Sequence, residues 1–315
     1  MGYGESVPLA HISGETVESV LDAVERAGRL LDGRTASSFR RLSREIAEAL
    51  PGQIAARAGV ETAMMDAFAR SRKASVWQWL GGSTGHFSTD VTIPICEPAR
   101  AAELAAQAAA DGFELLKLKV GREDDAERLA RVSASAPSAS FILDANQAFD
   151  PGSAATFLRS LPFDSERVKV FEQPVKAEDI AGLKRASGNS PVPVYADESV
   201  KNPVDALELV RVGAARGINV KVQKSGILGA LDIAAICRAA GLELMIGCML
   251  ETAVGLSASA HLACGLGDFR YADLDSDLLI AEDIGTPGFV RKGPEIAILD
   301  LPGFGAQPPA GVFDS

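Results

Sequence analysis

The chain has 315 residues, of which 47% are hydrophobic and 23% are charged, and it carries a net charge of −11 at pH 7. This composition is that of a globular protein, and it excludes wholesale disorder. The acidic balance argues against a surface for nucleic acid or an anionic membrane, because both require concentrated positive charge. At this length we expect about two domains with a large core.

The four cysteines show no C-x-x-C spacing, so neither a zinc ribbon nor a redox pair is indicated. They are typical of reduced core residues in a cytoplasmic protein. The first ten residues lack the basic and apolar stretches of a secretory signal. The apolar run from Leu244 to Leu250 is far too short to span a bilayer. We therefore expect a cytoplasmic location and no membrane partner.

Up to about Gly85 the pattern is helical. Apolar residues recur at helical spacing in three segments: Val17–Leu31, Arg40–Leu50 and Ile54–Arg70. Thr16 and the residues just before it offer a cap for the first of these helices. In this zone only the stretch Met1–Val7 could add a strand.

From Asp90 onward, short apolar strands alternate with alanine-rich amphipathic helices. The expected strands are Val91–Ile95, Leu115–Val120, Ser140–Asp144, Val168–Phe171, Val192–Ala196, Ile218–Lys221, Leu242–Gly247 and Phe269–Asp273. The clearest helical stretches between them are Pro98–Asp111, Asp205–Val212 and Gly229–Ala240. Repeated βα units predict a parallel sheet, and about eight of them close a barrel. An open, doubly wound sheet is the alternative, although no glycine-rich phosphate loop follows the first strand.

Polar residues stand at the strand ends at a steady interval. They are Lys119, Asp144, Glu172, Asp197, Lys221, Gly247 and Asp273. Residues two apart on a strand share a face, so Lys117 faces the same way as Lys119. One charge alone would indicate a solvated side chain or a structural ion pair. A whole register of charged strand ends indicates instead a site at the mouth of the barrel, because converging buried charges must neutralise one another or bind something.

Three of these residues, Asp144, Glu172 and Asp197, are carboxylates that end consecutive strands. Hard oxygen ligands with no nearby histidine or cysteine suit Mg²⁺. Lys119 and Lys221 flank the triplet in sequence, and closing the barrel would place them on opposite sides of the metal. A lysine near a cation has a lowered pKa and can act as a base near neutral pH. The pattern thus predicts removal of a proton alpha to a carboxylate, with Mg²⁺ stabilising the enolate.

Five stretches carry a resemblance to a known family. They are Lys117-Leu-Lys119, FILDAN ending at Asn146, VFEQPV around Glu172, YADESV around Asp197 and INVKVQKSG around Lys221. In this order and spacing they resemble the enolase superfamily, in its muconate-lactonizing subgroup. The helical stretch GVETAMMDAFARSRKASVWQWLGG is similar to the link between capping domain and barrel in that family. The resemblance implies an α/β fold, a (β/α)7β TIM-like barrel with an incomplete α+β capping domain.

The resemblance also implies a division of the chain into domains. We expect a partial N-terminal capping domain at 1–85, a catalytic barrel at 86–284 and a segment at 285–315 that returns to the cap. Members of the family begin with an antiparallel sheet and a mobile loop that covers the substrate. Strands of that sheet are not evident in this sequence, and the segment Pro8–Ile12 would represent the lid.

Within the subgroup, two later stretches resemble the dipeptide epimerases of the L-Ala-D/L-Glu epimerase group. They are LMIGCMLET, which holds Cys248 and Glu251, and Asp273-Leu-Asp275. The resemblance implies epimerisation of dipeptides by 1,1-proton transfer at the alpha carbon of the C-terminal residue, through an enolate, with one Mg²⁺ per subunit. It also leaves a homo-oligomer open.

The roles implied for individual residues follow from the same resemblance. Lys119 and Lys221 would be the two catalytic bases. The metal ligands would be Asp144, Glu172 and Asp197. The substrate would be bound by Lys117, Cys248, Glu251, Asp273 and Asp275, and the aspartate pair would hold its ammonium group. The remaining residues, Asn146, Glu198 and Lys224, would support these groups through hydrogen bonds.

Two other functions stay open. o-Succinylbenzoate synthase or N-succinylamino acid racemase chemistry would use the same scaffold, but those substrates lack the free ammonium that Asp273 and Asp275 would bind. A barrel that binds a small ligand without catalysis is the second, although idle converging charges would only cost stability. His261 lies in an alanine-rich helix and is typical of a packed residue, which disfavours a histidine-based racemase.

Overall fold

The computed structural model describes the whole chain except residues 9, 283, 310 and 312–315. Its main sheet has eight parallel strands in the order β2-β3-β4-β5-β6-β7-β8-β9. They are β2 (Val91–Ile93), β3 (Leu115–Lys119), β4 (Ser140–Asp144), β5 (Val168–Glu172), β6 (Val194–Ala196), β7 (Gly217–Lys221), β8 (Glu243–Gly247) and β9 (Phe269–Asp273). All eight strands expected from the sequence are present, with boundaries that differ by at most two residues.

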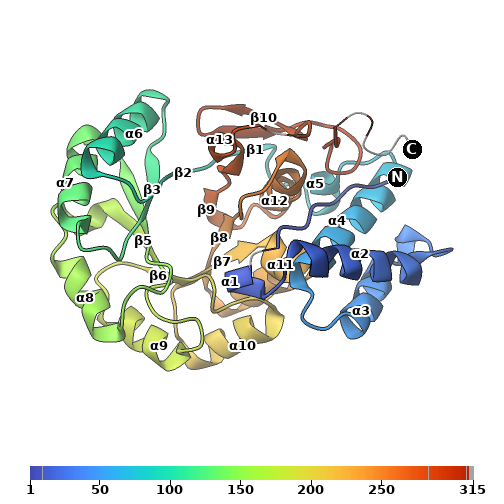
Figure 1. The fold of residues 1–315 in the computed structure, drawn as a ribbon, viewed down its shortest axis with the longest axis horizontal. Coiled ribbons are helices and arrows are strands. Elements are labelled where there is room, and N and C mark those ends of the chain that lie inside the picture. Colours follow the sequence, from blue (N-terminus) through green and yellow to red (C-terminus); the bar gives the residue numbers. More distant parts are fainter. Residues whose placement is uncertain (9, 283, 310, 312–315) are drawn as a thin grey trace.

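One helix joins each strand to the next, and together these helices cover the outside of the sheet (Figure 1). They are α6 (Pro98–Ala110), α7 (Asp125–Ser135), α8 (Pro151–Arg159), α9 (Ile180–Asn189), α10 (Pro203–Val212), α11 (Val222–Ala240) and α12 (Ala253–Leu266). Short 3₁₀ and α turns, η2 (Ser165–Arg167) and α13 (Ser276–Leu279), lie in the connections. Eight strands and seven helices confirm the predicted (β/α)7β barrel.

Local chemistry determines where such helices begin and end, and α10 illustrates it. The Asn202 side chain accepts hydrogen bonds from the backbone N–H groups of Val204 and Asp205, and Pro203 occupies the first helical position. At the other end Gly213 adopts a left-handed conformation, with φ of 66°. This helix therefore begins two residues before the expected Asp205.

The barrel closes where its first and last strands meet. The Asp90 N–H donates to the Ala272 carbonyl at 2.9 Å, and the Leu274 N–H donates to Thr89 Oγ1 at 2.8 Å. These bonds join the residues just before β2 to β9, so the alternative of an open, doubly wound sheet is wrong.

Side chains that point into the barrel fall into two layers. Ile142, Val170, Tyr195 and Met245 form a buried apolar cluster inside it. Two residues further along their strands, at the carboxyl ends, come Asp144, Glu172, Asp197 and Gly247. The intervening residues of each strand face outward and pack against the helices in the main core. The apolar layer fills the base of the barrel, so the charged layer is confined to its mouth.

A separate helical unit lies beside the barrel. It contains α1 (Ala10–Ser13), α2 (Val17–Leu31), η1 (Ala36–Ser38), α3 (Phe39–Ala49), α4 (Ile54–Ser71) and α5 (Val76–Trp79). A second core of residues such as Val20, Ile46 and Met64 holds α2, α3 and α4 together. The predicted cap before α2 is present, because Thr16 Oγ1 accepts from the Ser19 N–H and Ser19 Oγ accepts from the Thr16 N–H. The three helices expected in this zone are confirmed.

Residues 1–7 do not form a strand, so that expectation is wrong. Their backbone is satisfied by side chains instead: the Tyr3 N–H donates to Asp66 Oδ2 at 2.9 Å and the Val7 N–H to Gln223 Oε1 at 3.1 Å. The segment lies so close to α4 that a Cβ on Gly4 would be 2.0 Å from the Gly59 carbonyl oxygen. Close packing against α4, rather than pairing with a strand, therefore determines the path of residues 1–7.

The C-terminal part of the chain forms a small antiparallel sheet that the sequence did not predict. Its order is β1 (His86–Ser88), β11 (Glu295–Ile298), β10 (Phe289–Lys292). Beyond it, the Phe304 N–H donates to Asp66 Oδ1 on α4 at 2.7 Å. Residues 285–304 thus contact both the start of the barrel and the helical unit, while the domain boundaries themselves stay a prediction.

None of the helices in the described part of the chain is both long and apolar enough to cross a membrane.

Candidate active site

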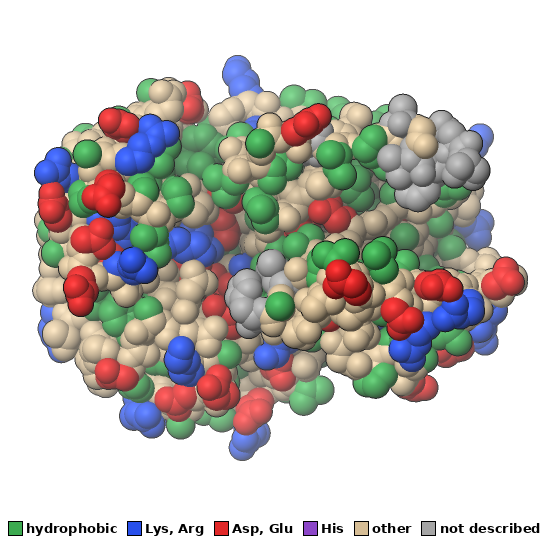
Figure 2. Space-filling model, viewed as in Figure 1, with side chains coloured by type: hydrophobic (Ala, Val, Ile, Leu, Met, Phe, Trp, Pro, Cys, Tyr) green, Lys and Arg blue, Asp and Glu red, His purple; other side chains and the backbone are tan. Residues whose placement is uncertain are grey.

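A cavity of about 490 Å³ opens at the carboxyl ends of the barrel strands. Nine of the thirteen side chains predicted for the site line it: Lys117, Lys119, Asn146, Asp197, Glu198, Lys221, Cys248, Asp273 and Asp275. Figure 2 shows acidic and basic side chains gathered near the centre of this face, where the barrel and the helical unit meet. The other four predicted residues are buried behind the lining.

Lys117 is the centre of the ionic network. Its Nζ lies 3.1 Å from Asp144 Oδ2, 2.9 Å from Glu172 Oε2 and 2.6 Å from Asp273 Oδ2, and its side chain is buried. Burial lowers the pKa of Lys117, but the carboxylates, with Asp144 and Asp273 first among them, outweigh burial and raise it well above its usual range. Lys117 is therefore a permanent cation and unsuited to be a base.

The two lysines expected to be bases come from opposite walls of the barrel. Lys119 ends β3 and its Nζ lies 2.7 Å from Asp144 Oδ2; Lys221 ends β7 and its Nζ lies 2.9 Å from Asp197 Oδ2. The two strands are four apart in an eight-stranded barrel. In this state burial lowers the pKa of Lys221, but the Asp197 carboxylate outweighs burial and raises it. The lowered lysine pKa expected from the sequence is thus not present at Lys221 while this ion pair is intact.

The three acids expected to bind a metal are all buried, and each faces a lysine. Despite burial, Lys117 and Lys119 lower the pKa of Asp144 to about 2. At Glu172, burial and then the Asp144 carboxylate raise the pKa to about 8. Asp144 is therefore ionised, and its negative charge opposes ionisation of the neighbouring Glu172.

Asp144, Glu172 and Asp197 carry the oxygen donors that suit a hard divalent cation, although among the described residues their oxygens do not all lie within 4.8 Å of one another, as those of Asp90, Asp273 and Asp275 do. Glu172 Oε2 is buried and accepts no hydrogen bond within the described residues, although Lys117 Nζ is near. Glu172 Oε1 is fixed by the Asn219 Nδ2–H at 2.7 Å, and Asp144 Oδ1 by the Asn146 N–H at 3.0 Å. Buried oxygens with spare lone pairs on three successive strands are the donor set that Mg²⁺ prefers.

Asn146 and Glu198, expected to support the ligands, do contact each other. Asn146 Nδ2 donates to Glu198 Oε1 at 3.3 Å, and Gln147 Nε2 donates to the same oxygen at 3.2 Å. Both Asn146 and Gln147 have left-handed backbone, with φ of 40° and 69°. Strained backbone of this kind is retained where surrounding contacts over-determine it, often at functional sites.

Lys224, the third supporting residue, is buried against Asp197. Its Nζ donates to both the side chain and the backbone carbonyl of Asp197, and to the Asn219 carbonyl at 3.2 Å. Burial, as the largest effect, lowers the pKa of Lys224. Lys224 thus contacts one of the predicted metal ligands, and its supporting role stays a prediction.

Sequence reasoning missed Gln173, which organises the loop after β6. Its Oε1 accepts from the N–H groups of Asp197 at 2.9 Å and Ser199 at 3.1 Å, and its Nε2 donates to Ser199 Oγ at 2.8 Å. In the sequence this glutamine directly follows Glu172, but its partners lie beyond the next strand, so the local sequence does not reveal its role.

Cys248 and Glu251 have different positions relative to the cavity. Cys248 lines it, and burial, reinforced by the Asp273 carboxylate, raises the pKa of its thiol. Glu251 is buried outside the lining, where its Oε1 accepts from the Met249 N–H at 2.9 Å. Burial raises the pKa of Glu251 to about 8.

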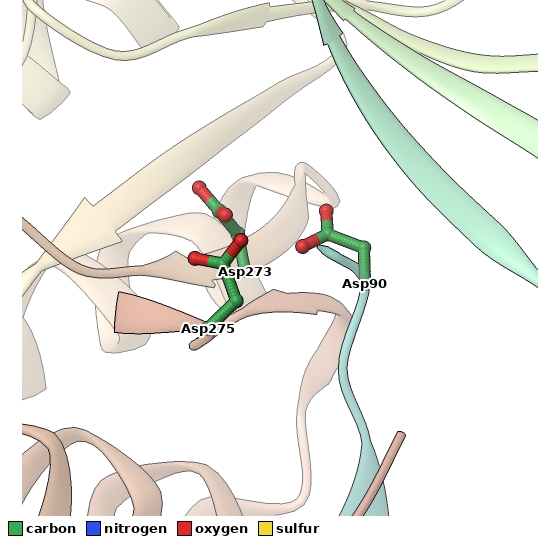
Figure 3. Close-up of side chains that lie close together, drawn as sticks. All are labelled: Asp90, Asp273 and Asp275. Atoms are coloured by element: carbon green, nitrogen blue, oxygen red, sulfur yellow. The ribbon is translucent and has the colours of Figure 1, made fainter. Parts of the chain in front are cut away.

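Asp273 and Asp275 line the cavity beside a third acid, Asp90, as Figure 3 shows. Within the described residues, these are the three acidic groups whose oxygens come within 4.8 Å of one another. The Asp275 Oδ2 accepts from the Thr92 N–H at 2.6 Å, while burial and the Asp273 carboxylate raise the pKa of Asp275 to about 6. Asp90 directly precedes the first barrel strand and was not singled out from the sequence.

Sequence comparisons agree with this architecture. Residues 100–311 match the family described as "Enolase C-terminal domain-like", and residues 1–81 match "Mandelate racemase / muconate lactonizing enzyme, N-terminal domain". Fold and site together define a (β/α)7β-barrel isomerase. The chain belongs to the mandelate racemase/muconate lactonizing enzyme family of the enolase superfamily, which confirms the resemblance.

Several relatives are similar over nearly the whole chain. An L-Ala-D/L-amino acid epimerase from Populus trichocarpa is 37% identical, over 100% of this chain and 75% of its own length. An L-Ala-D/L-Glu epimerase from Thermotoga maritima is 36% identical, over 95% of this chain and 87% of its own. The solved dipeptide epimerase from Enterococcus faecalis V583, complexed with Mg and the dipeptide L-Leu-L-Tyr, has a TM-score of 0.92 and 34% identity, covering 97% of this chain and 88% of that one.

Proposed function

We propose that this protein is a Mg²⁺-dependent dipeptide epimerase that moves a proton between the two faces of the alpha carbon of the C-terminal residue. The observation that carries the proposal is the position of Lys119 and Lys221, which face one cavity from walls four strands apart. An acid–base pair on opposite sides of one carbon can remove a proton from one face and return another to the opposite face, which inverts the centre. The names of the relatives in the preceding subsection support the substrate class.

Asp144, Glu172 and Asp197 would hold one Mg²⁺ per subunit. The ion would supply positive charge beside the substrate's carboxylate, where negative charge develops as the alpha proton leaves. Lys117, which already contacts two of these acids, adds a second fixed positive charge at the same place. Asn146, Glu198 and Lys224 keep these carboxylates oriented through the contacts described above.

The ion pairs explain how the lysines change protonation state. Lys221 is a cation while Asp197 is its sole partner, because the pair outweighs burial. Asp197 already shares its charge with Lys224, and the pKa of Lys221 is still raised. Only a further, divalent cation held by Asp197 would weaken the pair enough for burial to lower the pKa of Lys221 toward the range of a base. Lys119 Nζ likewise lies 2.7 Å from Asp144 Oδ2.

Asp273 and Asp275 would bind the dipeptide's ammonium group. They lie on the cavity wall at the end of β9 and just beyond it, where their carboxylate oxygens can accept hydrogen bonds from an ammonium group. Cys248 would contact the substrate from the end of β8. Glu251 would act through the Met249 backbone, since it does not line the cavity.

Deuterium incorporation tests this proposal. The protein with Mg²⁺ is incubated with a library of L,L-dipeptides in D₂O, and mass spectrometry and chiral separation follow the products. We expect one deuterium at the C-terminal alpha carbon together with the epimer, and no epimer from Lys119→Ala or Lys221→Ala. Lys184→Ala changes an exposed lysine on α9 and is the matched control. Absence of exchange and of epimer with every dipeptide contradicts the proposal and favours the non-catalytic ligand-binding barrel.

A second arm separates the proposal from chemistry on N-succinylated substrates or o-succinylbenzoate. Asp275→Asn removes one negative charge from the ammonium-binding pair, so we expect KM for a dipeptide to rise about tenfold or more. Turnover of a succinylated substrate would be almost unchanged by this variant. If only succinylated substrates react, and Asp275→Asn leaves them unaffected, the dipeptide assignment is wrong. The cytoplasmic location and a homo-oligomer stay predictions.

A further inference from the structure

Asp90 is a buried acid that lies beside two other acids, Asp273 and Asp275. Its side chain has no solvent exposure, and neither carboxylate oxygen accepts a hydrogen bond from any described residue. Its position is fixed, because its backbone N–H donates a hydrogen bond to the Ala272 carbonyl where the first and last strands of the barrel meet. An ionised carboxylate in such a place would be strongly unfavourable.

The acidic neighbours of Asp90 are already engaged with other donors. Asp273 Oδ2 accepts from Lys117 Nζ at 2.6 Å, and Asp275 Oδ2 accepts from the Thr92 N–H at 2.6 Å. Figure 3 shows the Asp90 carboxylate pointing toward both. Among the described residues, the cation acting on Asp90 is Lys117, which also pairs with Asp144 and Glu172 and so cannot neutralise Asp90, Asp273 and Asp275 as well. Acids this close to one another share protons.

We propose that Asp90 is a protonated, positioning acid whose O–H donates a hydrogen bond to Asp273, and so holds the Asp273–Asp275 pair in place and negatively charged for the substrate's ammonium group. The inference rests on the proposed function for its substrate. Asp90 does not touch the substrate itself, because it is fully buried and does not line the cavity. Burial, followed by the Asp273 and Asp275 carboxylates, raises the pKa of Asp90 well above its usual range, which agrees with a proton held at neutral pH.

The first test uses two substitutions that differ in hydrogen-bonding capacity. Asp90→Asn keeps a donor of similar size, so KM and kcat for a dipeptide should stay within about threefold of the wild type. Asp90→Ala removes the donor and frees the pair to move, so KM should rise about tenfold while kcat changes little. Equal behaviour of Asp90→Asn and Asp90→Ala overturns the proposal. If the wild-type protein exchanges no dipeptide proton, the proposed function is wrong. The second test then decides the role of Asp90 by itself.

The second test observes the proton directly and needs no substrate. Infrared difference spectra of the wild type minus Asp90→Asn at neutral pH should contain the C=O band of a protonated carboxylic acid. Its absence overturns the proposal, even if Asp90→Ala does not fold. The ionisable groups facing this position are Asp273, Asp275 and Lys117, all present in both proteins. Calorimetric titration with Mg²⁺ should give the same stoichiometry for both, and loss of a bound ion from Asp90→Asn would make Asp90 a metal ligand and overturn the proposal.

Discussion

Single side chains at the mouth of the barrel have several charged partners at once, and Lys117 is the clearest case. It contacts Asp144, Glu172 and Asp273, which lie on three other strands. Removing the shared cation would leave these buried carboxylates repelling one another. The ionic layer therefore depends on this lysine for stability before it serves any substrate.

We predict that Lys117→Met destabilises the metal-free protein by about 3–5 kcal/mol, the cost of breaking a buried ion pair. Urea unfolding in the presence of a chelator measures the change. Adding Mg²⁺ should recover part of the loss, because a cation bound by Asp144 and Glu172 replaces some of the missing charge. Lys184→Met alters an exposed lysine and should change stability by less than about 0.5 kcal/mol. Equal stability of the two variants would contradict this role for Lys117.

Several residues of the site could be read from the sequence, and others could not. Lys119, Asp144 and Lys221 were predictable because charge at the end of an apolar strand is unusual in a buried environment. Asp90 and Gln173 were missed because their roles depend on groups that the fold brings close from distant parts of the chain. Asp90 meets Asp273 only when the barrel closes, and Gln173 binds the backbone of the next strand's loop.

Among the elements, α12 joins the barrel to the short helix α5. His261 on α12 is fully buried, and its Nδ1 accepts a hydrogen bond from the Trp77 N–H at 3.3 Å. Accepting this bond requires an unprotonated Nδ1, and burial lowers the pKa of His261 to about 3. Protonating this side chain in the folded protein is therefore unfavourable.

The pKa of His261 is lower in the folded than in the unfolded chain. Lowering the pH should therefore weaken the packing of α12 against α5. Below the unfolded value of 6.5 the unfolded chain binds a proton that the folded chain does not, so stability falls as pH drops toward about 3. Between pH 7 and pH 5 we expect the free energy of unfolding to fall by about 2 kcal/mol more in the wild type than in His261→Gln. Urea unfolding at the two pH values measures this difference, and identical pH dependence in the two proteins would contradict it.

The barrel strands and helices were predictable because each repeats a regular pattern of apolar residues. The small sheet of β1, β10 and β11 was not, because its short strands lie outside the repeated βα units that made the equally short β2 and β6 recognisable. Its register also joins distant positions, such as Phe87 with Ile296. Strand pairing over that separation is a property of the tertiary fold rather than of local sequence.

Across the whole molecule, function follows from dividing the barrel into an apolar base and a charged mouth. The base holds the strands together, so the strand ends can carry charges that local packing alone would not tolerate. The helical unit and the C-terminal sheet lie beside the barrel without supplying the predicted bases or metal ligands. Catalysis would then depend on the strand positions of two lysines.

Stereospecific exchange by single-lysine variants tests that claim most directly. Each epimer of one dipeptide is incubated in D₂O with Lys119→Ala or Lys221→Ala, and alpha-deuterium content is measured. Because the lysines face opposite sides of the cavity, each variant should exchange only the epimer whose alpha proton faces the lysine it retains. The two variants should therefore have opposite preferences. Exchange of both epimers by either variant, or the same preference in both, would contradict a two-lysine mechanism.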